Sequence, residues 1–195
     1  MTTDVIDQLV GIRPGDPLDI LRDQRPNARA NAQASFDALF DSDELSQVAQ
    51  RERLALAYWT VALSKSPTAS FYRDLLAAED AGLVDALEAA LPGALTHGPY
   101  GDYPAGPLSV ENVVGLHWSP PAELATAAGP RLAAALAHTH LLVYRPRDAS
   151  ADALQELLDA GWSTTGIVTL SQLVAFLSFQ LRVVAGLTVL KGELA

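Results

Sequence analysis

The stretch STTGIVTLSQLVAFLSFQLRVVAGL, from Ser163 to Leu187, decides the expected fold. It begins with residues typical of a helix N-cap and carries no charge before Arg182. Apolar residues recur at steps of three and four, the period of a helix face, at Ile167, Leu170, Val174, Leu177, Leu181 and Val184. The opposite side carries Leu173, Phe176, Phe179 and Val183, so we expect other elements to surround this helix. The sequence therefore predicts an all-α, multi-helix bundle with a long, buried C-terminal helix.

Length and composition fit one globular domain with a substantial core. The chain has 195 residues, of which 49% are hydrophobic and only 18% are charged. The low charge indicates that some surface is buried between subunits, so we expect a homo-oligomer, whether dimer, trimer or hexamer. A net charge of −10 argues against nucleic acid and against an anionic membrane surface as partners. The absence of cysteine excludes disulfides, thiolate nucleophiles and cysteine-ligated metals, and we predict neither a metal nor a cofactor.

The C-terminal stretch is long enough to raise the question of a membrane span. Gln172, Gln180 and Arg182 interrupt it and no aromatic belt flanks it, which favours the core helix of a soluble protein. The acidic N-terminus MTTDVIDQLVG lacks the basic-then-apolar order of a signal peptide. We therefore expect a cytoplasmic protein with no membrane partner.

Proline and glycine divide the chain into helical segments within a single domain, 1–195. Short helical pieces are expected in the first 30 residues, broken by prolines, and the stretch 92–108 is a Gly-, Pro- and Tyr-rich loop. Longer helices are expected over 27–40, 45–63, 67–78, 80–91, 130–144, 150–160 and 167–190. The domain thus has an N-terminal helical extension (1–44), a central helical region (45–91), the loop, and a C-terminal helical region (109–195).

Two stretches of the chain resemble a known superfamily. RLAAALAHTHLLVYRPRDAS (131–150) and ALQELLDAGWSTTGIVTLSQLVAFLSFQLRVVAGL (153–187) resemble the peroxidase-related branch of the alkylhydroperoxidase D and carboxymuconolactone decarboxylase superfamily. The upstream QRERLALAYWTVALSKSPTASFYRDLL (50–76) is similar to the signature helix pair of that superfamily. The resemblance implies an all-α fold whose subunits oligomerise through helical faces. It also implies reduction of hydroperoxides or decarboxylation of small organic acids as the family activity.

The residues that carry thiol chemistry in this superfamily are missing here. The resemblance implies a CxxC pair, a histidine four residues after it and a glutamate about twelve residues before it. These positions fall on Leu54, Ser66, Ala69 and Arg73, and a two-residue shift gives Glu52, Ser64, Pro67 and Phe71 instead. A serine hydroxyl has no redox couple and does not replace a peroxidatic thiolate. Thiol peroxidase activity is therefore not expected, and whether the chain is an enzyme stays open.

Three residues are our candidates for chemistry that needs no cysteine. Glu52 is a candidate base, although a glutamate in a first helical turn also complements the helix dipole. His117, beside Trp118, is a candidate acid or a packed histidine. Arg182 is a candidate clamp for a substrate carboxylate, or one half of a buried ion pair with Glu52 or Glu111.

The serine and histidine clusters each have a structural alternative. Ser66 marks the position of the family thiols and is either a polar remnant of a pocket or a helix cap. His138 and His140 lie two apart on a predicted helix, so they face different directions and do not suit a shared metal.

Two functional hypotheses remain from the sequence. One is an enzyme that carries out acid–base chemistry on a small organic acid. The other is a non-catalytic protein that binds a small molecule, or that assembles with a cysteine-bearing relative.

Overall fold

The computed structural model describes residues 4–194, which form nine α-helices and no strand. The α-helices are α1 (Val5–Val10), α2 (Pro17–Asp23), α3 (Pro26–Phe40), α4 (Gln50–Leu63), α5 (Ala69–Ala94), α6 (Ala122–Ala128), α7 (Pro130–Tyr144), α8 (Ala151–Asp159) and α9 (Thr164–Leu194). Two short 3-10 turns, η1 (Pro107–Glu111) and η2 (Pro146–Asp148), lie among them. Within this range the β-type pairing is a single bridge between Gly101 and Val113. The prediction of an all-α fold is confirmed.

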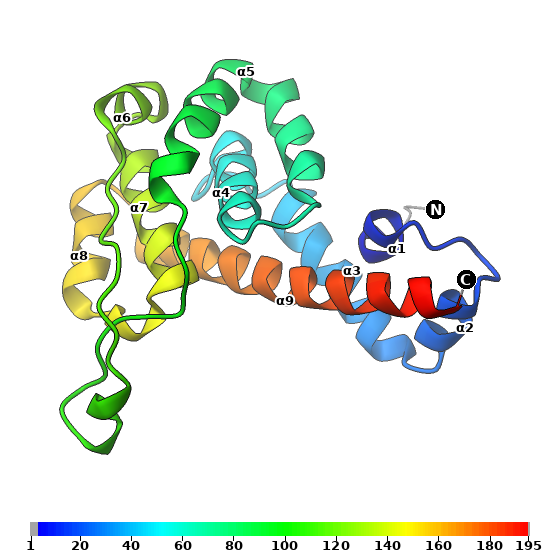
Figure 1. Cartoon of the computed structure of the whole chain (residues 1–195). Coiled ribbons are helices and arrows are strands. Elements are labelled where there is room, and N and C mark those ends of the chain that lie inside the picture. Colours follow the sequence, from blue (N-terminus) through cyan, green and yellow to red (C-terminus); the bar gives the residue numbers. More distant parts are fainter. Residues whose placement is uncertain (1–3, 195) are drawn as a thin grey trace.

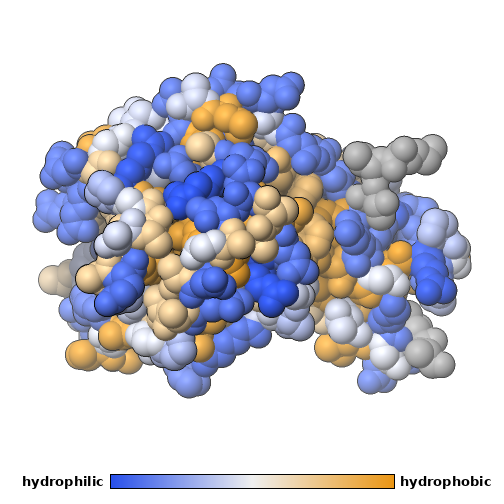
Figure 2. Space-filling view, turned by 90° about the horizontal axis from the view of Figure 1, so that it is seen from above, coloured by the Kyte–Doolittle hydropathy of each residue, from blue (hydrophilic) through white to orange (hydrophobic). Residues whose placement is uncertain are grey.

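Helix α4 occupies the centre of the molecule. Every residue from 53 to 63 is buried, and α4 packs against α5, α7 and α9. Helix α9 runs along one edge of the fold, with α7 and α8 near its start and α1, α2 and α3 near its end (Figure 1). Seen from above, the surface of the main body mixes hydrophilic and hydrophobic residues in small patches (Figure 2).

Helix α9 is buried on one side only, which corrects the prediction that it is surrounded. Leu170, Leu173 and Leu177 are fully buried, whereas Phe179 is 48% exposed and Val189 is 68% exposed. A helix of 31 residues is about 46 Å long, more than the diameter of a small domain, so the shorter helices cover one side of it. Among the described residues, α9 is the one helix long and apolar enough to cross a membrane, and the predicted cytoplasmic location stays a prediction.

Helix α4 begins at Gln50, five residues later than the predicted start. The Arg53 side chain is buried and donates to the carbonyl oxygens of Leu39 (2.7 Å), Glu44 (2.7 Å) and Val48 (3.0 Å). It thereby takes up carbonyls that a longer helix would use, and residues 41–49 form an irregular link. Ala49 is the N-cap residue of α4, and its N–H donates a hydrogen bond to the side chain of Glu52 (3.0 Å).

Helix α5 contains the break that the sequence predicts between two helices. Asp80 has a non-helical backbone conformation, and its side chain accepts hydrogen bonds from the Leu83 N–H (3.0 Å) and from Arg51 Nε (2.7 Å). The second half continues to Ala94, past the predicted end at 91, with Pro92 in its last turn.

One buried hydrogen bond joins α5 to α9. The Tyr72 hydroxyl donates to Gln180 Oε1 at 2.6 Å, and both side chains are inaccessible to solvent. Burial raises the pKa of Tyr72, so the phenol is neutral and remains a donor. The Gln180 Nε2 atom has no hydrogen-bond partner among residues 4–194, so this carboxamide depends on Tyr72 for its hydrogen bonding.

We expect Tyr72→Phe to lower the free energy of unfolding by about 2 kcal/mol, because it leaves both polar atoms of the Gln180 carboxamide buried without partners. The double variant Tyr72→Phe with Gln180→Leu removes both polar groups and is expected to recover most of that loss. Urea denaturation of the three proteins measures the difference. Equal losses in the single and double variants would show that packing, not the hydrogen bond, sets the cost.

Candidate functional site

The structure places the three candidate residues at three separate locations. Glu52 lies in the first turn of α4, His117 lies in the extended segment before α6, and Arg182 lies on the exposed side of α9. The catalytic grouping of Glu52, His117 and Arg182 is therefore not formed in this fold. The reason differs for each residue.

Glu52 is held by a structural ion pair between α4 and α7. Its carboxylate accepts from Arg131 Nε at 2.8 Å, in addition to its bond to the Ala49 N–H. Arg131 also donates to the carbonyl oxygens of Gln47 (2.6 Å) and Gly161 (2.8 Å), and its guanidinium lies 4.1 Å from the ring centroid of Trp162. The Glu52 carboxylate thus connects α4 to Arg131 of α7, and Arg131 in turn contacts the segment that leads into α9.

His117 is exposed because its neighbour Trp118 is the residue that packs inward. The Trp118 ring lies 5.0 Å from the ring of Trp59 and 5.4 Å from that of His140. His117 lines a small depression of about 230 Å³ together with Asp148. Burial alone would raise the pKa of the Asp148 carboxyl, but the Asp102 N–H and the Arg145 guanidinium hold it below its usual value. The Asp148 carboxylate in this depression is therefore ionised and already paired with Arg145, so it is not suited to act as a general base.

His138 and His140 are both buried in α7 and serve its packing. His140 Nε2 lies 3.0 Å from the carbonyl oxygen of Ala94, and its ring packs against Tyr144. Burial lowers the pKa of both imidazoles, which favours their neutral forms. Among residues 4–194 no group of three or more His, Asp or Glu side chains is placed to hold a metal ion.

The positions that correspond to the family thiols and their relay do not form a site. Leu54 is buried in α4, Ala69 is the first residue of α5, and Arg73 is exposed and paired with Asp74 (2.7 Å). Ser66 makes local bonds in the turn before α5, since its hydroxyl lies 2.9 Å from that of Thr68 and accepts from the Thr68 N–H (3.3 Å). These bonds fit the capping interpretation of Ser66 better than a relay.

Arg182 does share a groove with Ser66, and this groove is the candidate functional site. The groove has a volume of about 410 Å³ and is lined by the α4–α5 turn, by Val143 of α7 and by the middle of α9. Its lining residues are Ser64, Lys65, Ser66, Pro67, Val143, Ser178, Leu181, Arg182 and Ala185. Two cations and three hydroxyls therefore meet on a partly apolar surface. We call it the Lys65–Arg182 groove.

Neither cation of this groove is paired with a carboxylate of the described chain. Arg182 donates from Nη1 to the Ser178 carbonyl oxygen (2.6 Å), within its own helix, and makes no ion pair with Glu52 or Glu111. Lys65 makes no ion pair with any residue in the range 4–194. The predicted ion pair of Arg182 is thus absent because Arg131 holds Glu52, and Arg182 remains exposed.

Lys65 occupies a backbone conformation that usually belongs to glycine. It is the one non-glycine residue with positive φ in the described chain, at 54°. The Lys65 N–H bonds to the Ala62 carbonyl (2.9 Å) and the Ser66 N–H bonds to the Val61 carbonyl (3.3 Å), which is the Schellman ending of α4. A side chain in this left-handed conformation costs about 1 kcal/mol relative to glycine. Lys65 therefore stands where glycine would fit with less strain.

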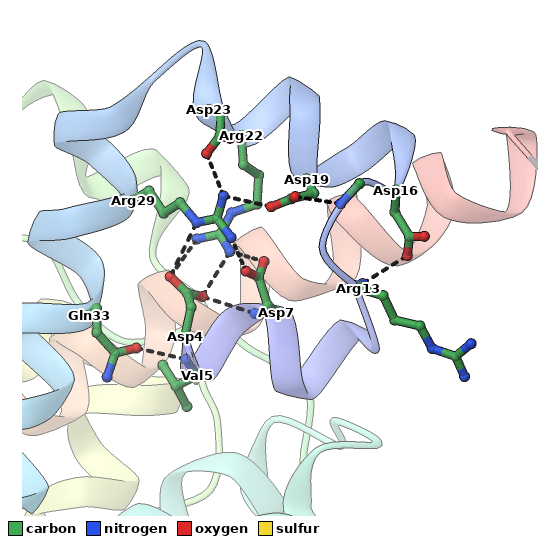
Figure 3. Close-up of polar contacts among 11 residues, drawn as sticks. Asp4, Val5, Asp7, Arg13, Asp16, Asp19, Arg22, Asp23, Arg29 and Gln33 are labelled. Carbon is green, nitrogen blue, oxygen red and sulfur yellow. Dashed lines mark hydrogen bonds and ion pairs between the residues drawn. The ribbon is translucent and has the colours of Figure 1, made fainter. Parts of the chain in front are cut away.

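A network of six charged side chains fixes α1, α2 and α3 to one another (Figure 3). Its members are Asp4, Asp7, Asp19, Arg22, Asp23 and Arg29. Arg22 pairs with Asp4 (2.8 Å) and with Asp7, and Arg29 pairs with Asp7 and with Asp19 (2.8 Å). The Gly15 N–H and the Arg29 guanidinium lower the pKa of Asp19. Burial opposes the charge of Arg29, but its carboxylate partners outweigh burial and raise its pKa. This network is structural, since each of its four carboxylates is paired with Arg22 or Arg29.

Sequence reasoning identified Arg182 and Ser66 but missed Lys65. The only signal for Lys65 is its position directly after the end of α4, where the Schellman motif usually has glycine. The N-terminal ion network was also missed, because Asp and Arg in a short polar segment predict a solvated surface as readily as an ordered cluster.

No family model, curated protein or solved structure matches this chain. The resemblance to the alkylhydroperoxidase D and carboxymuconolactone decarboxylase superfamily therefore stays a prediction.

We expect Arg29→Met to lower the free energy of unfolding at pH 7 by about 2 kcal/mol, less than for a fully buried pair because Arg29 keeps some contact with water. It should also flatten the pH dependence in acid. A carboxyl with a depressed folded pKa, such as Asp19, stabilises the fold above its unfolded pKa near 3.8 and loses that effect as the pH falls further. Urea denaturation between pH 7 and pH 2.5 tests both effects. Arg73→Met, at an exposed arginine, is the control, and parallel acid losses in wild type and Arg29→Met would exclude the network as their source.

Proposed function

We propose that this protein binds a small organic carboxylate in the Lys65–Arg182 groove, without catalysing its conversion. The observation that supports this most is the meeting of two cations, unpaired within the described chain, in one groove of a protein with net charge −10. Elsewhere in the described chain, acids outnumber bases, and most arginines are bound by carboxylates or carbonyls, with Arg13 and Arg25 as the exceptions. An anion is the ligand that this groove lacks.

The groups in the groove suit a carboxylate better than a larger anion. The Arg182 guanidinium presents a planar fork that matches the two oxygens of a carboxylate, and one of its nitrogens is already fixed by the Ser178 carbonyl. The Lys65 ammonium adds a second, flexible charge, and the hydroxyl of Ser178 offers a further hydrogen bond, whereas the Ser64 hydroxyl already donates to the Thr60 carbonyl oxygen (2.9 Å). Val143 and Leu181 supply an apolar wall for a short carbon chain. A volume of about 410 Å³ suits a molecule of metabolite size.

The composition of the groove favours binding over catalysis. Its lining contains no carboxylate, imidazole or thiol, so no side chain there is suited to take up a proton from a ligand near neutral pH. Glu52 and His117, the groups considered for that task, lie elsewhere and serve other contacts. Small organic acids are also the substrates that the predicted superfamily relationship implies for its decarboxylase members.

The backbone of Lys65 gives independent support. A strained residue persists where the surrounding structure imposes it, and such strain often accompanies a functional position. The left-handed conformation at the end of α4 directs the chain into the turn that carries Ser66 and Pro67. A lysine at this position places an ammonium group beside the groove at the expense of stability.

The test separates stability from binding at a single residue. We expect Lys65→Gly to leave the free energy of unfolding unchanged or to raise it by up to about 1 kcal/mol, because glycine relieves the positive φ. The same variant should bind carboxylates about tenfold more weakly, and Arg182→Gln should do the same, since each loses one charged contact. The measurements are urea denaturation and isothermal titration with short mono- and dicarboxylic acids chosen by a thermal-shift screen.

Arg73→Gln is the matched control, because it removes an exposed arginine that does not line the groove. It should bind as the wild type does. A carboxylate that binds equally well to wild type, Lys65→Gly and Arg182→Gln would place its site elsewhere. If no short carboxylic acid raises the melting temperature at millimolar concentration, the proposal is wrong.

A further inference from the structure

We propose that the exposed face formed by α3 and α9 is a two-fold symmetric interface with a second copy of this chain, in which α3 of one subunit lies antiparallel to α3 of its partner. The proposal is independent of the carboxylate groove. It rests on the shape of this face, on the distribution of charge along α3, and on the surface area of the chain.

The face consists of one aromatic side chain between two grooves. Phe179 lies on the exposed side of α9 and lines both of them. The first groove, about 620 Å³, lies beside the C-terminal end of α3 and includes Leu39 and Phe176. The second, about 440 Å³, lies beside the N-terminal end of α3 and includes Val183. A ridge with a groove on each side is the arrangement into which the side chains of another helix pack.

The neighbouring surface allows another backbone to come close. Most exposed positions of α3 carry small residues, among them Ala28, Asn31, Ala34, Ser35 and Ala38. On α9 the exposed residues on the Phe179 side are Val168, Gln172, Ala175, Gly186, Val189 and Leu190. Apart from Arg182, this strip of α9 has no charge before Lys191. A monomer would leave it in water.

Charge along α3 identifies the occupant as a second copy in antiparallel orientation. Arg25 precedes the first residue of α3, lines the second groove and makes no ion pair within residues 4–194. Asp41 ends α3 and Asp43 follows; both are exposed, and they flank Ser42, which lines the first groove. Each charge opposes the dipole of its own helix, which is positive at the N-terminus and negative at the C-terminus. An antiparallel α3 of a partner brings Asp41 near Arg25 at both ends, so the interface is complementary to itself.

The surface area is consistent with a dimer. The chain exposes 10398 Å², whereas a compact monomer of 20.7 kDa exposes about 8,900 Å². A specific interface buries about 800 Å² on each partner. The difference is therefore sufficient for one interface of ordinary size.

Three variants test the interface by sedimentation velocity between 1 and 100 μM. We expect the wild type to be a dimer, and Phe179→Asp to raise the dimer dissociation constant at least tenfold. Arg25→Glu and Asp41→Arg should each do the same, although each agrees better with the dipole of α3 and should fold at least as well. The variant that carries both reversed charges should dimerise again, since in a two-fold interface the reversed pair faces itself.

Leu154→Asp on α8 and Arg73→Glu on α5 are the controls, because both lie outside the face and are exposed. They should leave the dissociation constant unchanged, and circular dichroism checks that every variant is folded. A wild type that is monomeric at 100 μM overturns the proposal, as does a trimer or hexamer, or a dimer that Phe179→Asp leaves intact. The proposal is also overturned if the wild type is a monomer that binds phosphatidylcholine vesicles and Phe179→Asp abolishes this binding. That result would assign the face to contact with lipid.

Discussion

The length of α9 is the constraint on which the rest of this structure depends. With 31 residues, α9 is longer than a small domain is wide, and two separate sets of helices pack along it. The main core gathers around α4 and the first half of α9. A second, smaller core joins α1, α2 and α3 to the second half through Val184. The charged network of α1–α3 belongs to this smaller unit, which has few apolar residues of its own.

The same constraint explains the two proposed sites. Both lie where α9 passes between the two sets of helices and is not covered by either. On one side, the turn after α4 approaches α9 and leaves the Lys65–Arg182 groove. On the other, α3 crosses near Phe179 and leaves the two grooves of the proposed interface. Arg182 and Phe179 are three residues apart, so ligand binding and assembly would occupy neighbouring parts of one helix.

The sequence predicted the helical class and most helices, because apolar period and proline positions are local signals. It did not predict that α9 is covered on one side, since periodicity reports which residues are apolar and not how many helices are available to bury them. The start of α4 was misplaced for a similar reason. The pattern of residues 45–49 permits a helix, and only the buried guanidinium of Arg53 shows why one does not form.

The candidate site was predicted in part. Arg182 stood out because a charge in an apolar helix needs an explanation, and Ser66 stood out through the resemblance. Glu52 and His117 did not join them, because Arg131 from α7 holds one and the inward packing of Trp118 turns the other outward. Contacts between residues 79 positions apart, such as Arg131 and Glu52, leave no trace in local pattern.

The ion network of α1–α3 has a consequence for the order in which the chain acquires structure during synthesis. All six charged residues lie between positions 4 and 29, so they are able to pair as soon as this segment leaves the ribosome. The apolar partner of the same segment, around Val184, is made more than 150 residues later. Local ionic contacts thus tie the first three helices together during the interval, and the last helix completes their core when translation reaches it.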